Sequence, residues 1–263
     1  MTFGSNFGRT FSPTFNPKSQ AVSGGWFPTD ITGCKLWLDF SDADTLFTDA
    51  GKTKVANDGD AIYQANDKSG NNFNATQTTS ANRPLYKTAK LNGLSTSYFD
   101  GSNDSFALPA LGFSGNPPIS VFVVQHTISN ERNTYFTLGL GETNKCFAIR
   151  SDKDTKYYVY FYGNDASITG VSSYYGKYVL TNIIYTASSL TVSAYQNGIF
   201  IKNVTISSTP NVSNSNYKIG VNFGGYEPHY GYIAEIIIYN TALSDTDRGK
   251  VETYLNNKWA IYS

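Results

Sequence analysis

The side chains with the clearest capacity for chemistry are carboxylates and amides that gather in short groups. Three such groups are present, formed by Asp100 with Asn103 and Asp104, by Asp39 with Asp42 and Asp44, and by Asp58 with Asp60. Oxygen atoms of this kind are the ligands of Ca²⁺, which takes about six to eight of them. Asp and Asn are equally the ordinary formers of β-turns, and no group has the spacing of an EF-hand. We expect turns here and keep Asp100, Asn103 and Asp104 as a candidate calcium site, with no other cofactor.

The remaining polar residues do not form a catalytic pattern. The two histidines, His126 and His229, lie far apart in the sequence. No Gly-x-Ser-x-Gly elbow accompanies them, and the glycine-rich stretch 220–225 is not followed by a helix that would hold a phosphate. We expect His126 to pack within a strand and His229 to lie in a loop. The sequence therefore predicts a protein that is not an enzyme.

A tyrosine-rich segment near the end of the chain offers a different chemistry. Tyr226 and Tyr230 flank Glu227 and His229. Aromatic faces stack on sugar rings, and neighbouring polar groups bind sugar hydroxyls. A glycan site formed by Tyr226, His229 and Tyr230 is one interpretation. The other is that these tyrosines only cover the ends of strands.

The start of the chain carries four phenylalanines at intervals of four residues, Phe3, Phe7, Phe11 and Phe15. Gly, Pro, Ser and Thr between them disfavour a helix. Each ring contributes about 1.5–3 kcal/mol when it is fully buried, so we expect residues 1–25 to form an extended arm that docks into a partner protein. The alternative, that the rings pack onto their own domain, stays open.

Composition excludes several classes of function. Lys and Arg total 20, as do Asp and Glu, so the net charge is zero and no basic surface for nucleic acid is indicated. Charged residues make up only 15%, whereas 20 Tyr and 17 Phe suit a recognition protein. No apolar run approaches the ~18 residues of a membrane helix, and the first residues do not resemble a secretory signal peptide. Cys34 and Cys146 are expected as small buried residues, and their pairing is left open.

Strand signals continue from residue 26 to the end of the chain, because β-branched and aromatic residues recur between turn formers. Strands are expected at 35–40, 119–127, 135–140, 146–150, 156–162, 178–185, 190–196, 199–204, 217–221 and 232–239. The Asn197-Gly198 pair predicts a two-residue hairpin. Residues 233–239 are almost continuously apolar, which is typical of a central strand covered on both faces.

Two local patterns refine this picture. In 156–162 one face would carry Tyr157, Val159 and Phe161 and the other Tyr158, Tyr160 and Tyr162, either as an exposed tyrosine surface or as a second packed face. Near the end, Ser244 followed by Asp245 and Asp247 predicts the start of a helix that continues to 258–259. Many strands and one terminal helix indicate an all-β sandwich or jelly roll.

Several segments, taken in order, resemble a known family. They are 37–42 (Trp-Leu-Asp-Phe-Ser-Asp), 67–71 (Asp-Lys-Ser-Gly-Asn), 82–84 (Asn-Arg-Pro), 99–104 (Phe-Asp-Gly-Ser-Asn-Asp), 231–239 and 243–245 with the helix after it. Together they are similar to concanavalin A-like domains of the laminin-G-like (LamG) jelly-roll type found in phage and bacterial proteins. The resemblance implies a jelly-roll β-sandwich over 26–263 with one short C-terminal helix.

The same resemblance bears on catalysis. Glycanases of this superfamily place paired acids on one strand, whereas the corresponding strand here offers only Glu235. Glycoside hydrolysis requires two carboxyl groups. Glu235 is therefore expected to be a structural hydrogen-bond acceptor where the strand meets the helix.

The combined features predict a phage or virus virion protein, present in many copies. The arm would bind other virion proteins in a capsid, neck or tail, and the outward lectin-like domain would contact host surface glycans. Release of virions by lysis would explain a protein that acts outside the cell without a signal peptide. The alternative is a free extracellular carbohydrate-binding or adhesion protein without catalytic activity. Neither interpretation includes nucleic-acid binding or membrane insertion.

Overall fold

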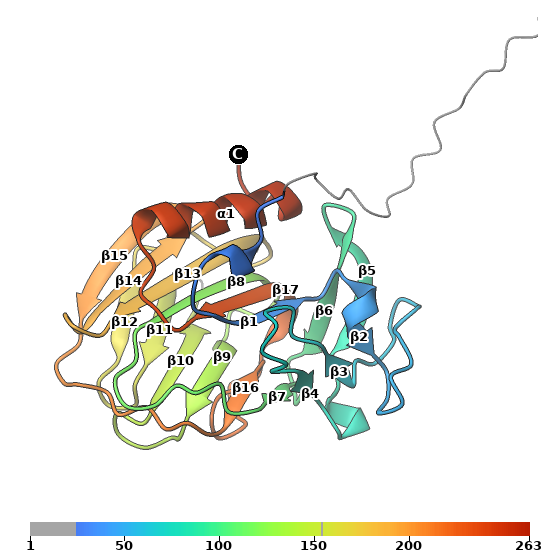
Figure 1. Ribbon diagram of the computed structural model, residues 1–263, viewed down its shortest axis with the longest axis horizontal. Helices are drawn as coiled ribbons and strands as arrows, with labels where there is room; N and C mark the ends of the chain where they lie inside the picture. Colours follow the sequence, from blue (N-terminus) through green and yellow to red (C-terminus); the bar gives the residue numbers. More distant parts are fainter. Residues whose placement is uncertain (1–24, 154) are drawn as a thin grey trace, which may run out of the picture.

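The computed structural model describes residues 25–153 and 155–263. The predicted docking arm, with Phe3, Phe7, Phe11 and Phe15, lies outside the described residues except for Gly25. The described part forms two β-sheets and one α-helix (Figure 1).

The strands divide between the two sheets as follows. The first sheet contains β1 (Cys34–Asp39), β5 (Leu85–Leu91), β6 (Leu94–Asp100), β8 (Ile119–Thr127), β13 (Tyr178–Thr186), β14 (Thr191–Gln196), β15 (Ile199–Thr205) and β17 (Tyr230–Tyr239). The second contains β2 (Leu46–Phe47), β3 (Gln64–Ala65), β4 (Ala75–Thr76), β7 (Phe106–Leu108), β9 (Asn133–Gly139), β10 (Cys146–Ser151), β11 (Lys156–Tyr160), β12 (Ala166–Thr169) and β16 (Tyr217–Ile219). Short 3₁₀ turns occupy Pro28–Asp30, Ala43–Thr45 and Ser80–Asn82, and α1 spans Asp245–Trp259.

Neighbouring strands within each sheet run antiparallel. The first sheet has the order β15-β14-β13-β8-β17-β6-β5, with β1 also paired to β17, and the second has the order β12-β11-β10-β9-β16-β7-β4-β3-β2. Strands that are distant in sequence are therefore neighbours in space, as in a jelly roll. The predicted all-β sandwich is confirmed.

All ten predicted strands are present, with ends that differ by a few residues from the prediction. Asn197 and Gly198 both have positive φ, as a type I′ hairpin requires, and β17 is buried on both faces along most of its length. The Ser244 hydroxyl accepts a hydrogen bond from the Asp247 N–H, which confirms the predicted helix start. The strands that sequence reasoning missed are β2–β7 and β12, several of them only two or three residues long.

The core has two layers. The larger layer fills the space between the sheets, where Tyr157, Val159 and Phe161 are fully buried. The smaller layer lies between the outer face of the first sheet and α1, and includes Phe122 and Leu255 (Figure 1). Cys146 is buried and Cys34 half-buried, and both are free thiols.

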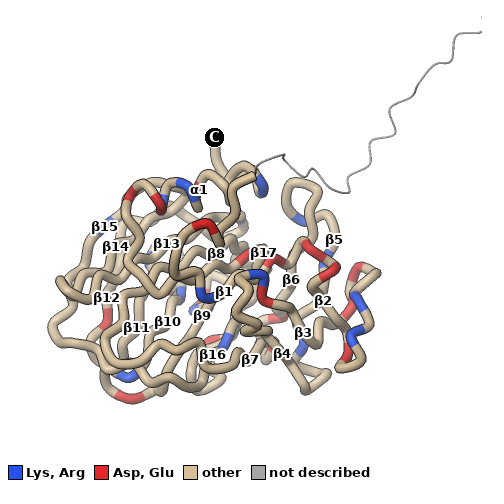
Figure 2. The backbone as a smooth tube through the Cα atoms, viewed as in Figure 1, with Lys and Arg blue, Asp and Glu red and all other residues tan. Residues whose placement is uncertain are grey.

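Charge is sparse and mixed in sign over the described residues (Figure 2). Residues 25–153 and 155–263 include no helix with the length and apolar character needed to cross a membrane.

Candidate functional site

The outer face of the second sheet carries an open tyrosine surface. Along β11, side chains alternate between the two faces, so Tyr157 and Val159 point into the core. Tyr158 and Tyr160 are half-buried on the outer face, and their rings contact each other with centroids 6.3 Å apart. Tyr162, just beyond the strand, is 40% exposed. Of the two interpretations of this segment, the exposed tyrosine surface is confirmed.

Arg150 of β10 lies against these rings. Its guanidinium carbon is 4.3 Å from the centroid of Tyr160 and 5.1 Å from that of Tyr158, a cation–π arrangement. Although Arg150 lies on the outer face, the exposed fraction of its side chain is only 6%. Its Nε–H is buried and has no hydrogen-bond partner among the described residues.

Three further charged residues complete the arrangement around Arg150. The Glu227 carboxylate accepts hydrogen bonds from Arg150 and, at 3.3 Å, from Arg132. Asp152 lies 3.5 Å from the Arg132 guanidinium and 3.9 Å from that of Arg150. Two positive and two negative side chains therefore balance each other. We define the Arg150 cluster as Arg132, Arg150, Asp152, Tyr158, Tyr160 and Glu227.

Glu227 reaches the sheet because its loop is fixed at several points. Asn222 accepts hydrogen bonds from the N–H groups of Gly224 and Tyr226 and donates one to the Glu227 carboxylate. The Glu227 carbonyl accepts the N–H of Thr134, and its φ of 53° turns the chain back toward the sheet. The loop is thus a fixed wall beside the tyrosine surface.

A surface pocket of about 460 Å³ adjoins the cluster and shares Arg132 with it. Its other lining residues are Asp100, Gly101, Ser129, Glu131, Asn133, Pro228 and Tyr230. The Asn133 side chain accepts the Tyr230 N–H at 2.7 Å and donates to the Ser129 and Glu131 carbonyls of its own loop, so it ties this loop to Tyr230 across the pocket. Gly101 cannot carry a side chain here, because a Cβ would lie 2.7 Å from that of Tyr230.

The predicted glycan residues have different positions. Tyr226 is 72% exposed at the tip of the Glu227 loop, and Tyr230 lines the pocket. His229 is fully buried between the rings of Phe99 and Tyr135, so the prediction that it contacts a glycan is wrong. Its loop passes inward at that point, and burial lowers the pKa of the imidazole to about 3.

The predicted calcium residues form a turn. The Asp100 carboxylate accepts the N–H groups of Ser102 and Asn103, and the Asp104 carboxylate accepts the N–H of Asp100. Burial, together with the nearby Asp100 charge, raises the pKa of Asp104 to about 7. Within the described ranges, no three His, Cys, Asp or Glu side chains are grouped to hold a metal ion. The calcium site stays a prediction.

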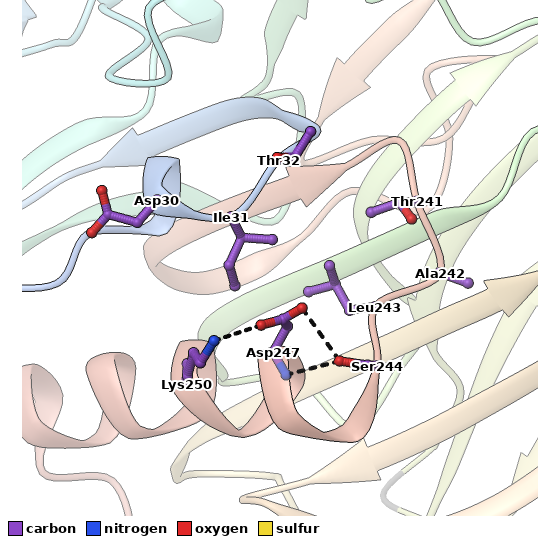
Figure 3. A pocket seen from close by; sticks show the side chains of 9 residues that line it. All are labelled: Asp30, Ile31, Thr32, Thr241, Ala242, Leu243, Ser244, Asp247 and Lys250. Atoms are coloured by element: carbon purple, nitrogen blue, oxygen red, sulfur yellow. Dashed lines mark hydrogen bonds and ion pairs between the residues drawn. The ribbon is translucent and has the colours of Figure 1, made fainter.

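A second pocket, of about 380 Å³, lies at the start of α1 (Figure 3). Its polar side chains are bonded to each other: the Asp247 carboxylate binds Lys250 at 2.8 Å and the Ser244 hydroxyl at 3.3 Å. These contacts are the ordinary ones of a capped helix. We therefore regard the Arg150 cluster as the better candidate site.

Glu235, the residue to which the sequence assigned a structural role, is fully buried beneath α1. Its carboxylate accepts hydrogen bonds from Trp37 at 2.6 Å and from Trp259 at 2.7 Å. It also binds the Tyr254 hydroxyl at 2.9 Å and the Lys258 ammonium at 2.8 Å. The predicted role as an acceptor at the seam of strand and helix is confirmed.

A second carboxylate lies beside Glu235, which the sequence did not reveal. Asp39 of β1 is directly opposite Glu235 of β17, and Lys258 binds both. Burial raises the pKa of Glu235, because it outweighs the attraction of Lys258. Burial acts in the same direction on Asp39, but Lys258 and Lys68 outweigh it and lower the pKa to about 2. We define the Glu235 cluster as Trp37, Asp39, Glu235, Tyr254, Lys258 and Trp259.

The family of the chain follows from its sequence. The family described as the concanavalin A-like lectin/glucanases superfamily matches residues 100–247, more than half of the 263 residues. The chain belongs to this family. The resemblance noted from the sequence is confirmed, and the matched range contains every residue of the Arg150 cluster. No curated protein sequence matches the chain.

Solved structures show the same fold in carbohydrate-related proteins. Domain 4 of the extracellular GH43 arabinanase AbnA from Geobacillus stearothermophilus, solved in complex with arabinotriose, aligns with a TM-score of 0.57 and 18% identity. The alignment covers 82% of this chain and 96% of that domain. At such identity the likeness shows the fold alone.

Two larger proteins contain a similar domain. The binding domain of Paraclostridial Mosquitocidal Protein 1 has a TM-score of 0.58 and 15% identity, over 88% of this chain and 53% of that one. Trypanosoma rangeli sialidase has a TM-score of 0.56 and 14% identity, over 87% of this chain and 33% of the enzyme. This chain thus spans only part of those proteins and shares their jelly-roll fold.

Sequence reasoning missed Arg132 and Arg150 as members of the site. Arg150 and Glu227 are 77 positions apart, and their pairing requires β10 to lie beneath the Glu227 loop. The available signal was the sequence of 156–162, whose outer tyrosines indicated a surface without indicating its charged neighbours.

Proposed function

We propose that this chain is a non-catalytic glycan-binding protein of a virion, with its ligand site at the Arg150 cluster and the adjoining pocket. The observation that carries the glycan site is the open arrangement of Tyr158 and Tyr160 beside Arg150 and Glu227. Ring faces bind the apolar side of a sugar, and fixed charged groups bind its hydroxyls. The equal charges in the cluster favour a neutral glycan.

The absence of catalysis is part of this proposal. A glycosidase needs one protonated carboxyl group and a second carboxylate on opposite sides of the bond. In the Arg150 cluster, Glu227 and Asp152 both face guanidinium groups. In the Glu235 cluster, both carboxylates are buried beneath α1 and bonded to Lys258. The first pair is bound to guanidinium groups and the second is covered by α1, and both arrangements support a non-catalytic role.

The virion role rests on the first residues of the sequence. The phenylalanine repeat at Phe3, Phe7, Phe11 and Phe15 precedes a domain whose described elements begin at Pro28. In this role the arm binds other virion proteins, many copies assemble, and the sandwich contacts host surface glycans. A free extracellular carbohydrate-binding or adhesion protein is the second candidate.

The glycan site is tested by an array of neutral and charged glycans, followed by calorimetric titration of the strongest binder. Tyr160→Leu and Arg132→Ala should each weaken binding about tenfold, as losses of a stacking face and of a charged donor do. Tyr63→Leu is the matched control, since Tyr63 is a half-buried tyrosine that stacks with Arg83 away from the cluster. Unchanged affinity in both site variants would reject the assignment.

The virion role is tested separately by deleting residues 1–22. The domain should keep its melting temperature, and incorporation into particles should be lost. Phe7→Ala or Phe11→Ala should weaken docking by about 2–4 kcal/mol if the ring fills a pocket in the partner. A truncated protein that unfolds would show that the arm belongs to its own core, and the second candidate would then be preferred.

A further inference from the structure

A row of aromatic rings crosses the outer face of the first sheet. Tyr178 of β13, His126 of β8, Tyr232 of β17 and Tyr98 of β6 lie directly opposite one another on four neighbouring strands. Ring centroids are 4.9 Å apart for the first pair, 5.6 Å for the second and 5.1 Å for the third. We call these four residues the aromatic row.

The row begins where the cover provided by α1 ends. Two positions closer to the helix on β13, β8 and β17 are Leu180, Val124 and Ala234, all buried in the layer beneath α1. Residues two apart on a strand share a face, so the aromatic row continues this same face. Its four rings are half-buried instead of covered. The outer face of the first sheet therefore changes from a packed apolar layer to an accessible aromatic surface.

Tyr230 connects the aromatic row to the candidate site. It precedes Tyr232 by two residues on β17, and its ring centroid is 6.4 Å from that of Tyr98. Tyr230 also lines the pocket that contains Arg132 of the Arg150 cluster. The row and the pocket are thus continuous through one side chain.

The chemistry of the row selects the class of ligand. Three phenols and one imidazole carry no formal charge at neutral pH, since burial lowers the pKa of His126 below its ordinary value. Neighbouring ring centroids lie 4.9, 5.6 and 5.1 Å apart, near the spacing of strands and the length of one sugar residue. Sugar C–H faces stack on such rings. A charged polymer would find no opposite charge within the row.

We infer that the aromatic row forms additional subsites for an extended neutral polysaccharide whose bound end occupies the pocket at Tyr230 and the Arg150 cluster. This inference rests on the proposed glycan site and adds the ligand class: a long neutral chain in place of a single terminal sugar. A second copy of the chain, or another protein, is the competing occupant of the row.

The test compares short and long neutral glycans on the full chain. The probes are arabinotriose with linear arabinan, and cellotriose with hydroxyethyl cellulose, together with polygalacturonate as a charged polymer. The wild type should bind a neutral polymer more tightly than its trisaccharide. Tyr98→Leu and Tyr232→Leu should weaken polymer binding about three- to tenfold and leave trisaccharide binding unchanged. Tyr63→Leu again serves as control, and Tyr232→Phe, which keeps the ring, should retain most of the affinity.

The outcomes separate this inference from the proposed function. Two outcomes overturn the aromatic-row subsites alone. In the first, the wild type, Tyr98→Leu and Tyr232→Leu bind the polymer with equal affinity. In the second, the wild type binds the polymer no better than the trisaccharide. A wild type that binds none of the neutral probes rejects both proposals. A third outcome is that the wild type sediments as a dimer and the row variants as monomers that still bind the polymer. This result would identify a second copy of the chain as the occupant of the row and would also overturn the inference. Leucine keeps apolar volume, and the melting temperature of each variant verifies its fold.

Discussion

The Glu235 cluster and the Arg150 cluster are built from the same kinds of side chain, and they differ in what covers them. Each combines a glutamate, a basic partner and aromatic rings. Glu235 is fully buried beneath α1, where two indoles, a phenol and an ammonium occupy its two oxygens. Glu227 is 20% exposed and faces an open tyrosine surface.

The difference shows how similar residues serve stability in one region and recognition in another. A buried carboxylate is costly unless its partners are complete, so the Glu235 cluster holds α1, β1 and β17 in one arrangement. An accessible cluster keeps donors and ring faces available to a ligand. Burial with a full set of hydrogen-bond partners, more than residue type, separates the Glu235 cluster from the Arg150 cluster.

The largest loss of stability is expected when the buried glutamate of the Glu235 cluster is removed. Glu235→Ala removes one of the two carboxylates that bind Lys258 and leaves two indole N–H donors without an acceptor in the layer beneath α1. We expect the free energy of unfolding to fall by about 3–5 kcal/mol, the range measured when one partner of a buried ion pair is lost. Urea denaturation measures this change. A loss no greater than that of Glu227→Ala would contradict the structural assignment.

The next largest effect concerns pH. Because the pKa of Asp39 is lowered from 3.8 to about 2 in the folded protein, its contribution is present above pH ~4 and is lost as the pH falls through 2. The loss amounts to about 2 kcal/mol. Comparing unfolding free energies of the wild type and Asp39→Asn across this range checks the prediction. The asparagine variant should lack this part of the acid-induced decrease; equal slopes would show that Asp39 is not held by Lys258 and Lys68.

A smaller stability effect is expected in the open cluster. Glu227→Gln keeps the shape of the side chain, and the partly exposed position limits the cost to about 1 kcal/mol or less. Glycan affinity should nevertheless fall about tenfold, because Arg132 and Arg150 lose the negative charge of the acceptor that fixes their orientation. Melting curves and calorimetric titration on the same sample separate the two effects. A large stability loss with intact binding would reverse the roles of the two clusters.

The sequence predicts the architecture well where local signals are strong. The Asn197-Gly198 hairpin, the capped helix after Ser244 and the apolar strand before Tyr239 each have a local physical cause. The hairpin of Asn92 and Gly93 carries the same Asn-Gly signal and was missed, because its strand β5 exposes Thr88, Ala89 and Lys90 in a row and lacks a regular alternation. Strands β2–β4 have two residues each and no periodicity to detect.

The candidate site was less predictable than the fold. Glu235 was assigned correctly, since a lone carboxylate in an apolar strand must find partners. His229 was misplaced, because a loop position is usually exposed, whereas this loop inserts the imidazole between Phe99 and Tyr135. The Arg150 cluster assembles residues from the β10–β11 hairpin and from two loops distant in sequence, and their approach is a consequence of sheet topology.

The smallest expected effect is that of calcium. The Asp100 and Asp104 carboxylates already accept main-chain N–H groups, and with its pKa near 7 Asp104 is only partly ionised at neutral pH. Millimolar calcium should therefore raise the melting temperature little relative to EDTA, whereas a specific ligand in excess must raise it. A large rise that disappears in Asp100→Asn or Asp104→Asn would establish the calcium site.

The claim that the Arg150 cluster binds glycan and the Glu235 cluster does not is tested most directly by nuclear magnetic resonance. The isotope-labelled full chain is titrated with arabinotriose or with whichever neutral glycan binds best on the array. We predict that backbone signals of the Arg150 cluster shift in proportion to bound ligand, namely those of Arg132, Arg150, Tyr158, Tyr160 and Glu227. Signals of Glu235 and of α1 should stay in place. Shifts confined to α1 and the Glu235 cluster, with none in the Arg150 cluster, would contradict it.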